Sequence, residues 1–89
     1  MVVEFDKSFS KSLDKIPVNI LSRQIEKVID QLTNASKISD IVNCKKLTGF
    51  KNYYRIRLGD YRIGFEKVSE KKIRLIIVAH RKDVYRIFP

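Results

Sequence analysis

The sequence of 89 residues, 44% of them hydrophobic, has room for one small folded domain over residues 1–89 and is too apolar for a disordered chain. It has no apolar run long enough to span a membrane and no signal-peptide pattern, and its single cysteine and single histidine exclude an internal disulfide and a zinc site. We therefore expect a cytoplasmic protein without metal or cofactor. The net charge of +9 is confined to residues 45–89, which hold thirteen basic and four acidic residues, and this asymmetry predicts a nucleic acid or an acidic protein as partner.

The first third of the chain predicts a strand and two helices. Val2 to Phe5 has strand propensity, and Asp6 can cap a following helix. Pro17 ends that first helix and suits the start of a second, from Val18 to about Asn34. Each helix has one apolar stripe, which predicts that it packs on a core: Phe9, Leu13 and Ile16 in the first, and Leu21, Ile25, Val28, Ile29 and Leu32 in the second.

The next segment is predicted to be mainly irregular. Asn34 to Lys46 is interpreted as a loop with a short helical turn near Ile38 to Val42, and Cys44 within it as a small, partly buried side chain. Leu47 and Phe50 are expected to anchor the approach to the following strand, and Gly49 permits a turn there.

Residues 53–66 predict a β-hairpin. Two alternating runs rich in aromatic and β-branched residues flank Gly59-Asp60, a typical two-residue hairpin loop. With that loop, one face holds six residues suited to a core: Tyr54, Ile56, Leu58, Tyr61, Ile63 and Phe65. The other face holds Tyr53, Arg55, Arg57, Arg62, Gly64 and Glu66.

The second face of the hairpin carries an unfavourable charge pattern. Arg57 lies directly opposite Arg62, and like charges in such a pair destabilise a sheet. An anion that bridges the arginines beside Gly64, which has no side chain, would account for the cluster, because arginine holds phosphate with a planar fork of donors. The alternative is a solvated outer face whose charges only keep the sheet soluble.

The end of the chain predicts one more strand and a tail. Lys67 to Lys72 is a polar turn, and Ile73 to Ala79 suits a central strand buried on both faces. The order of elements therefore predicts an α+β fold: a small antiparallel sheet, made of the N-terminal strand and a three-strand C-terminal meander, with a two-helix hairpin packed on one face.

The remaining polar residues favour chemistry on phosphate. The sequence has no metal-binding cluster, no glycine-rich nucleotide loop and no Ser-His-Asp arrangement. Arginine, lysine and tyrosine can bind phosphate and stabilise its transition state, and RNA supplies its own nucleophile, the 2′-hydroxyl. Tyr53 or Tyr85 could stack on an unpaired base. His80 is the chemical candidate for proton transfer, although a histidine at a strand end can equally serve the fold.

The stretch Tyr54 to Phe65, followed by an apolar strand and then by His80 to Tyr85, resembles the toxins of the RelE/ParE superfamily, and more closely its RelE branch. The order of elements agrees over nearly the whole chain. The resemblance implies a toxin of a type II toxin–antitoxin pair, which cuts mRNA in the ribosomal A site and is neutralised by a cognate antitoxin.

By position, the resemblance implies roles for several residues. Arg62 matches an arginine that contacts the scissile phosphate, Arg81 one that serves the leaving group or the transition-state charge, and Tyr85 a tyrosine that orients the substrate. Arg55 and Arg57 fall where some relatives have two lysines, one of them proposed as general base. Arginine stays protonated in proteins, so this departure leaves the base unassigned. The peripheral residues expected to bind or steer RNA are Lys45, Lys46, Lys51, Tyr53, Lys82 and Arg86.

Three functions remain open from the sequence. The first is a metal-independent, ribosome-dependent mRNA endonuclease, which the joint presence of Arg62, Arg81 and Tyr85 favours. The second is a ParE-type inhibitor of DNA gyrase without nuclease activity, and the third is a basic RNA-binding module without catalysis. Codon preference and the identity of the antitoxin are not encoded in any recognisable pattern.

Overall fold

The computed structural model describes the backbone of residues 1–89 and the side chains of residues 1–17 and 21–89. The chain forms β1 (Val2–Phe5), α1 (Lys7–Leu13), α2 (Val18–Asn34), η1 (Ile38–Asp40), β2 (Cys44–Lys46), β3 (Tyr53–Leu58), β4 (Tyr61–Ser69), β5 (Lys72–His80) and α3 (Val84–Ile87). This confirms the predicted α+β fold. Among the described residues, no helix is long and apolar enough to cross a membrane.

Over the described residues the sheet has five strands in the order β1-β5-β4-β3-β2. The predicted meander of β3, β4 and β5 is antiparallel and is confirmed. Two details of the predicted sheet are wrong. β1 pairs with β5 in parallel, so the sheet is mixed, and Cys44–Lys46, which was assigned to a loop, forms the edge strand β2 beside β3. A three-residue edge strand with two lysines has no alternating apolar pattern, which is why the sequence concealed it.

The register of the β3–β4 hairpin is the predicted one at every position. Leu58 faces Tyr61, Arg57 faces Arg62, and Arg55 faces Gly64. The two-residue loop forms because Gly59 adopts a positive φ of 60°, which glycine tolerates without strain. The hairpin therefore places its apolar residues on one face and its arginines on the other.

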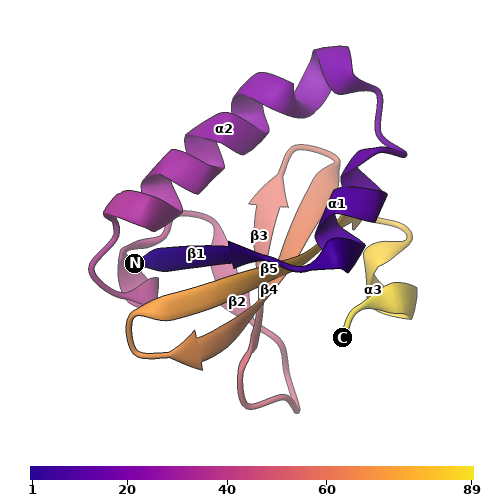
Figure 1. Ribbon diagram of the computed structural model, residues 1–89. Helices are drawn as coiled ribbons and strands as arrows, with labels where there is room; N and C mark the ends of the chain where they lie inside the picture. The colour runs from indigo at the N-terminus through magenta and orange to yellow at the C-terminus, as the bar shows by residue number, and fades with distance from the viewer.

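Helices α1 and α2 cover the apolar face of the sheet (Figure 1). Asp6 caps α1 as predicted, since its side chain accepts a hydrogen bond from the Ser8 backbone N–H at 3.0 Å. The core between the helices and the sheet joins the predicted stripes to the hairpin and β5, with buried Phe9, Leu21, Ile25, Val28, Leu32, Ile56, Ile63, Phe65, Ile73, Leu75 and Val78.

Strand β5 lies between β1 and β4, as expected for a central strand. Ile73, Leu75 and Val78 are buried against the helices, whereas the opposite face of β5 is only partly buried, so the prediction of burial on both faces holds for one. The register shifts between Gly64 and Phe65, whose partners are Ile77 and Leu75. This β-bulge interrupts the simple alternation of faces along β5.

Candidate functional site

The sheet face opposite α1 and α2 carries the arginine cluster, which we define as Arg55, Arg57, Arg62 and Arg81. The first two come from β3 and the third from β4, where the hairpin register puts them on one face. Arg81 follows β5, and its backbone N–H donates to the Asp60 carbonyl oxygen at 2.8 Å. That bond ties the end of β5 to the tip of the hairpin.

Arg62 lies at the centre of the cluster. Its Nη1 donates to the carbonyl oxygens of Gly59 and Tyr61, both at 2.8 Å, which fixes the guanidinium beside the hairpin loop. Partial burial lowers the pKa of Arg62, and repulsion from Arg55 and, more weakly, from Arg57 and Arg81 lowers it further. Among the described atoms, its Nε is buried without a hydrogen-bond acceptor. An arginine held this way favours a bound anion.

Carboxylates neutralise arginines elsewhere on the protein but scarcely within the cluster. Arg74 contacts Glu4 at 3.4 Å and Glu66 at 3.5 Å, and Arg86 contacts Asp83 at 2.7 Å. In the cluster, the Arg81 Nε lies 4.0 Å from an Asp60 oxygen. Within the described side chains, Arg55, Arg57 and Arg62 have no carboxylate oxygen within 4.0 Å; Arg57 contacts only the amide oxygen of Asn43, at 3.4 Å.

Helix α3 adds an aromatic side chain to the cluster. The guanidinium carbon of Arg55 lies 5.9 Å from the centre of the Tyr85 ring, a cation–π distance, and Tyr85 is 62% exposed. Val84 and Phe88 are buried and hold α3 against the sheet. The structure thus brings Tyr85 to the arginines, as predicted, and leaves most of its ring accessible.

The space above Gly64 is occupied, which corrects the prediction that this residue leaves room for an anion. A Cβ atom on Gly64 would lie 2.6 Å from Phe88 Cδ2, so the Phe88 ring rests directly on the glycine backbone. Glycine inside a strand often marks such a close approach. The space next to Gly64 is therefore filled by Phe88 and is not open to an anion.

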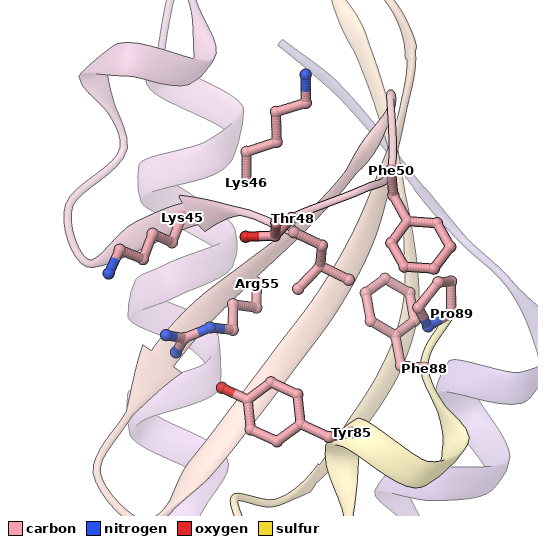
Figure 2. Close-up of a pocket in the computed structure, with 9 residues that line it drawn as sticks. Lys45, Lys46, Thr48, Phe50, Arg55, Tyr85, Phe88 and Pro89 are labelled. Carbon is pink, nitrogen blue, oxygen red and sulfur yellow. The ribbon is translucent and has the colours of Figure 1, made fainter.

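Two adjoining hollows open on this face. A cleft of about 510 Å³ is lined by Arg55, Tyr85, Phe88, Pro89 and residues of the β2–β3 segment (Figure 2). A smaller hollow of about 290 Å³ is lined by Asn43, Cys44, Lys45, Arg55, Arg57 and Arg62. Lys45 and Arg55 line both hollows and pair across β2 and β3, so the two hollows adjoin at these residues.

His80 lies on the other side of the sheet from the cluster. Its strand partner is Tyr61, a residue of the apolar face, and the two rings contact edge-on at 5.5 Å. The partner of Arg62 is instead Ala79. His80 Nδ1 accepts a hydrogen bond from the Lys82 N–H at 3.2 Å, which stabilises the turn after β5. The structure therefore does not bring the predicted proton carrier to the arginines.

The predicted RNA-contacting residues are distributed around the site. Lys45 shares the face of Arg55, whereas Lys46 pairs with Tyr54 of the opposite face and lines one end of the cleft. Lys51 and Lys82 are exposed, and Arg86 is engaged by Asp83. These positions suit electrostatic steering.

Aromatic side chains pack together at one side of the cleft. Tyr53, one of the two tyrosines that could stack on a base, contacts the rings of Phe50 at 6.0 Å and Phe88 at 5.5 Å, both edge-on. Sequence reasoning did not include Phe50 and Phe88 in the site. In the sequence, Gly64 was the feature that could have pointed to Phe88, because the missing side chain at position 64 leaves a space that the Phe88 ring fills.

Cys44 lines the smaller hollow and is partly buried, which confirms the prediction for this side chain. Burial raises the pKa of its thiol to about 11, so the protonated thiol is favoured at neutral pH.

Both the sequence and the fold of this chain resemble those of known proteins. Residues 3–85 match the family described as ParE toxin of type II toxin–antitoxin system, parDE. The chain is 42% identical over its whole length, and over the whole length of the relative, to a Methanocaldococcus jannaschii protein named Toxin RelE3. It superposes on the RelB–RelE antitoxin–toxin complex from Methanococcus jannaschii with a TM-score of 0.78 and 37% identity, over 97% of this chain and 99% of that one. For the archaeal RelE–RelB complex from Pyrococcus horikoshii the TM-score is 0.66 and the identity 28%, over 90% and 93%.

These matches cover almost all of the sequence. The chain therefore belongs to the family of ParE toxins of type II toxin–antitoxin systems, and within it the similarities are to proteins of the RelE branch.

Proposed function

We propose that this family member is a RelE-type toxin that cleaves mRNA in the ribosomal A site and is neutralised by a cognate antitoxin. The observation that carries the proposal is the arginine cluster: Arg55, Arg57 and Arg81 all repel Arg62, and the nearest carboxylate contact in the cluster is that of Arg81 with Asp60 at 4.0 Å. Folding alone disfavours such a cluster, and a phosphate diester would relieve its repulsion. The RelE names of its relatives support the same assignment.

The cleavage reaction needs only groups that the protein, the RNA and water supply. The 2′-oxygen of the ribose forms a bond to the adjacent phosphorus, and the bond from phosphorus to the 5′-oxygen of the next nucleotide breaks. The products are a 2′,3′-cyclic phosphate and a 5′-hydroxyl. The 2′-hydroxyl proton passes to water, and water protonates the leaving oxygen. The protein then contributes alignment and stabilisation of the negative charge that develops on phosphorus.

Each residue of the site has a role in this scheme. Arg62, fixed by two carbonyl oxygens, holds the scissile phosphate, and Arg81 on the far side of the hairpin loop stabilises charge on the leaving oxygen. Arg55 and Arg57 bind the phosphate from β3, and Tyr85 packs on Arg55 and orients the nucleotide. Because arginine accepts no proton, catalysis rests on fixed cations rather than on a general base.

The similar structures and the positive charge of the chain both support an antitoxin as its partner. Two similar structures are complexes of a RelE toxin with its RelB antitoxin. All of the net charge of +9 resides in residues 45–89, so an acidic partner would be captured rapidly and would mask the cluster.

Single-turnover cleavage of mRNA on programmed ribosomes tests the proposal. Arg62→Ala should reduce the rate by about 10²-fold or more, since one preorganised donor commonly contributes that much. Arg23→Ala is the matched control, because Arg23 is an exposed arginine on α2 and should leave the rate unchanged. Equal rates for Arg62→Ala and the parent would refute the site. Inhibition of gyrase supercoiling without mRNA cleavage would instead establish the ParE-type alternative.

A further inference from the structure

The cleft beside the arginine cluster has two chemically different walls (Figure 2). Lys45, Arg55 and the hydroxyl of Tyr85 form the polar side, and Phe50, Phe88 and Pro89 form the apolar side. Its volume of about 510 Å³ lies within the range of small-molecule sites, roughly 300–1,000 Å³. A ligand with a planar ring and a separate anionic group would match both walls.

Phe50 is an exposed aromatic held in a defined position. It is 46% exposed in the segment between β2 and β3, where Gly49 turns the chain with a φ of 84°. The Phe50 N–H donates to the Leu47 carbonyl at 3.3 Å, and its ring contacts Tyr53, which in turn contacts Phe88. The ring therefore presents apolar surface to the cleft instead of to the core.

The cleft and the phosphate-binding hollow share Lys45 and Arg55. A phosphate held by Arg55 and Arg62 would therefore lie where the two hollows adjoin, and the cleft next to it has room for the attached nucleoside. Figure 2 also shows the Thr48 hydroxyl between the walls, where it can exchange a hydrogen bond with the edge of a base.

We propose that this cleft is a nucleobase site, in which Phe50 stacks on the base of the nucleotide whose phosphate the arginine cluster binds. The proposal rests on the proposed function and specifies its substrate: the nucleotide must be unpaired, because a base inside a duplex is already stacked on both faces. Stacking on an aromatic side chain is largely indifferent to base identity, so Phe50 provides affinity and Thr48 is placed to discriminate among bases.

Titrations followed by NMR of the arginine Nε–H and phenylalanine ring signals test the site directly. The probes are inorganic phosphate, ribose 5-phosphate and adenosine 3′-monophosphate. All three should shift the Arg55 and Arg62 signals, but only the nucleotide should shift the Phe50 ring. The nucleotide should bind about 10-fold more tightly than inorganic phosphate, as expected for one stacked base.

Variants of Phe50 test whether its ring causes the tighter binding of the nucleotide. Phe50→Ala should remove the advantage of the nucleotide over phosphate, and Phe50→Trp should retain it. Phe5→Ala is the matched control, since Phe5 is 52% exposed but lies on β1 at the other edge of the sheet. Equal binding of nucleotide and phosphate to the parent, no binding of any probe, or an undiminished preference in Phe50→Ala would each overturn the proposal.

The same variants separate this inference from the proposed function. Ribosomal cleavage by the parent with no defect in Phe50→Ala and no nucleotide preference would refute the base site alone. Nucleotide binding that depends on Phe50, without cleavage of mRNA on ribosomes, would refute the endonuclease and leave the base site established.

Discussion

Replacement of Gly64 by alanine tests how the C-terminal segment is fastened to the sheet. The added methyl group would lie 2.6–2.8 Å from three carbons of the Phe88 ring, so one of the two groups must move. If the ring stays, overpacking costs about 1–3 kcal/mol. If the ring leaves, the protein loses the burial of a phenylalanine that is 5% exposed, worth roughly 1.5–3 kcal/mol.

Alanine also favours a strand over glycine by about 0.5–1 kcal/mol, which offsets part of this cost. We therefore expect Gly64→Ala to lower the free energy of unfolding by about 2 kcal/mol, which for a chain of 89 residues lowers Tm by roughly 10 °C. Thermal and urea unfolding monitored by circular dichroism would measure both quantities.

The double-mutant cycle with Phe88→Ala is the decisive control. Once the ring is absent, Gly64→Ala meets no obstacle and should be neutral or slightly stabilising, so the two substitutions should be strongly non-additive. Additive effects, or an unchanged Tm in Gly64→Ala alone, would refute the contact. Because Phe88 directly follows α3, which carries Tyr85, release of Phe88 should loosen the contact of Tyr85 with Arg55 and, in the proposed function, slow mRNA cleavage.

Three further predictions concern the site. Arg62→Ala should change the free energy of unfolding by less than about 1 kcal/mol, since relief of repulsion offsets two lost hydrogen bonds; a larger loss in urea unfolding would show that Arg62 mainly supports the fold. His80→Gln should leave single-turnover cleavage within about twofold of the parent between pH 6 and 9, and a large pH-dependent defect would show that the imidazole reaches the substrate. Cys44, with its pKa raised to about 11, should be alkylated by iodoacetamide at pH 8 at least about 10-fold more slowly than a free thiol, and unfolding in urea should abolish the difference.

The hairpin was predictable because its information is local. Gly59-Asp60 fixes a two-residue loop, and the loop then fixes every cross-strand pair, including Arg57 with Arg62. Helix α2 was predictable for a similar reason, since its apolar stripe repeats over several turns. Strand periodicity puts Arg55 and Arg57 on one face, and the pairing set by the loop adds Arg62 to it.

The rest depended on contacts between distant parts of the chain. The parallel pairing of β1 with β5 joins segments about seventy residues apart, and nothing in Val2–Phe5 specifies that partner. Strand β2 is too short for a recognisable period. Phe88 reaches Gly64 only because α3 folds back over the sheet. The sequence therefore showed that position 64 has no side chain, but not that the Phe88 ring fills the space next to it.

His80 and Arg81 are neighbours in the sequence, but Arg81 belongs to the arginine cluster and His80 lies on the opposite face of the sheet. The run before them is apolar without alternation, and the bulge in β5 shifts its register, so the face of His80 could not be counted from the sequence. The imidazole lies against Tyr61 on the apolar face, while the next residue donates its backbone N–H to Asp60 at the hairpin tip.

Arg62 binds the carbonyl of Gly59 in the same loop. The hairpin loop thus holds the guanidinium of Arg62 and the backbone of Arg81, and the Asp60 carboxylate lies 4.0 Å from the Arg81 Nε. In the proposed function, a phosphate diester bound at the cluster would relieve the repulsion that Arg55, Arg57 and Arg81 exert on Arg62, and the same fixed cations would stabilise the charge that develops in the transition state.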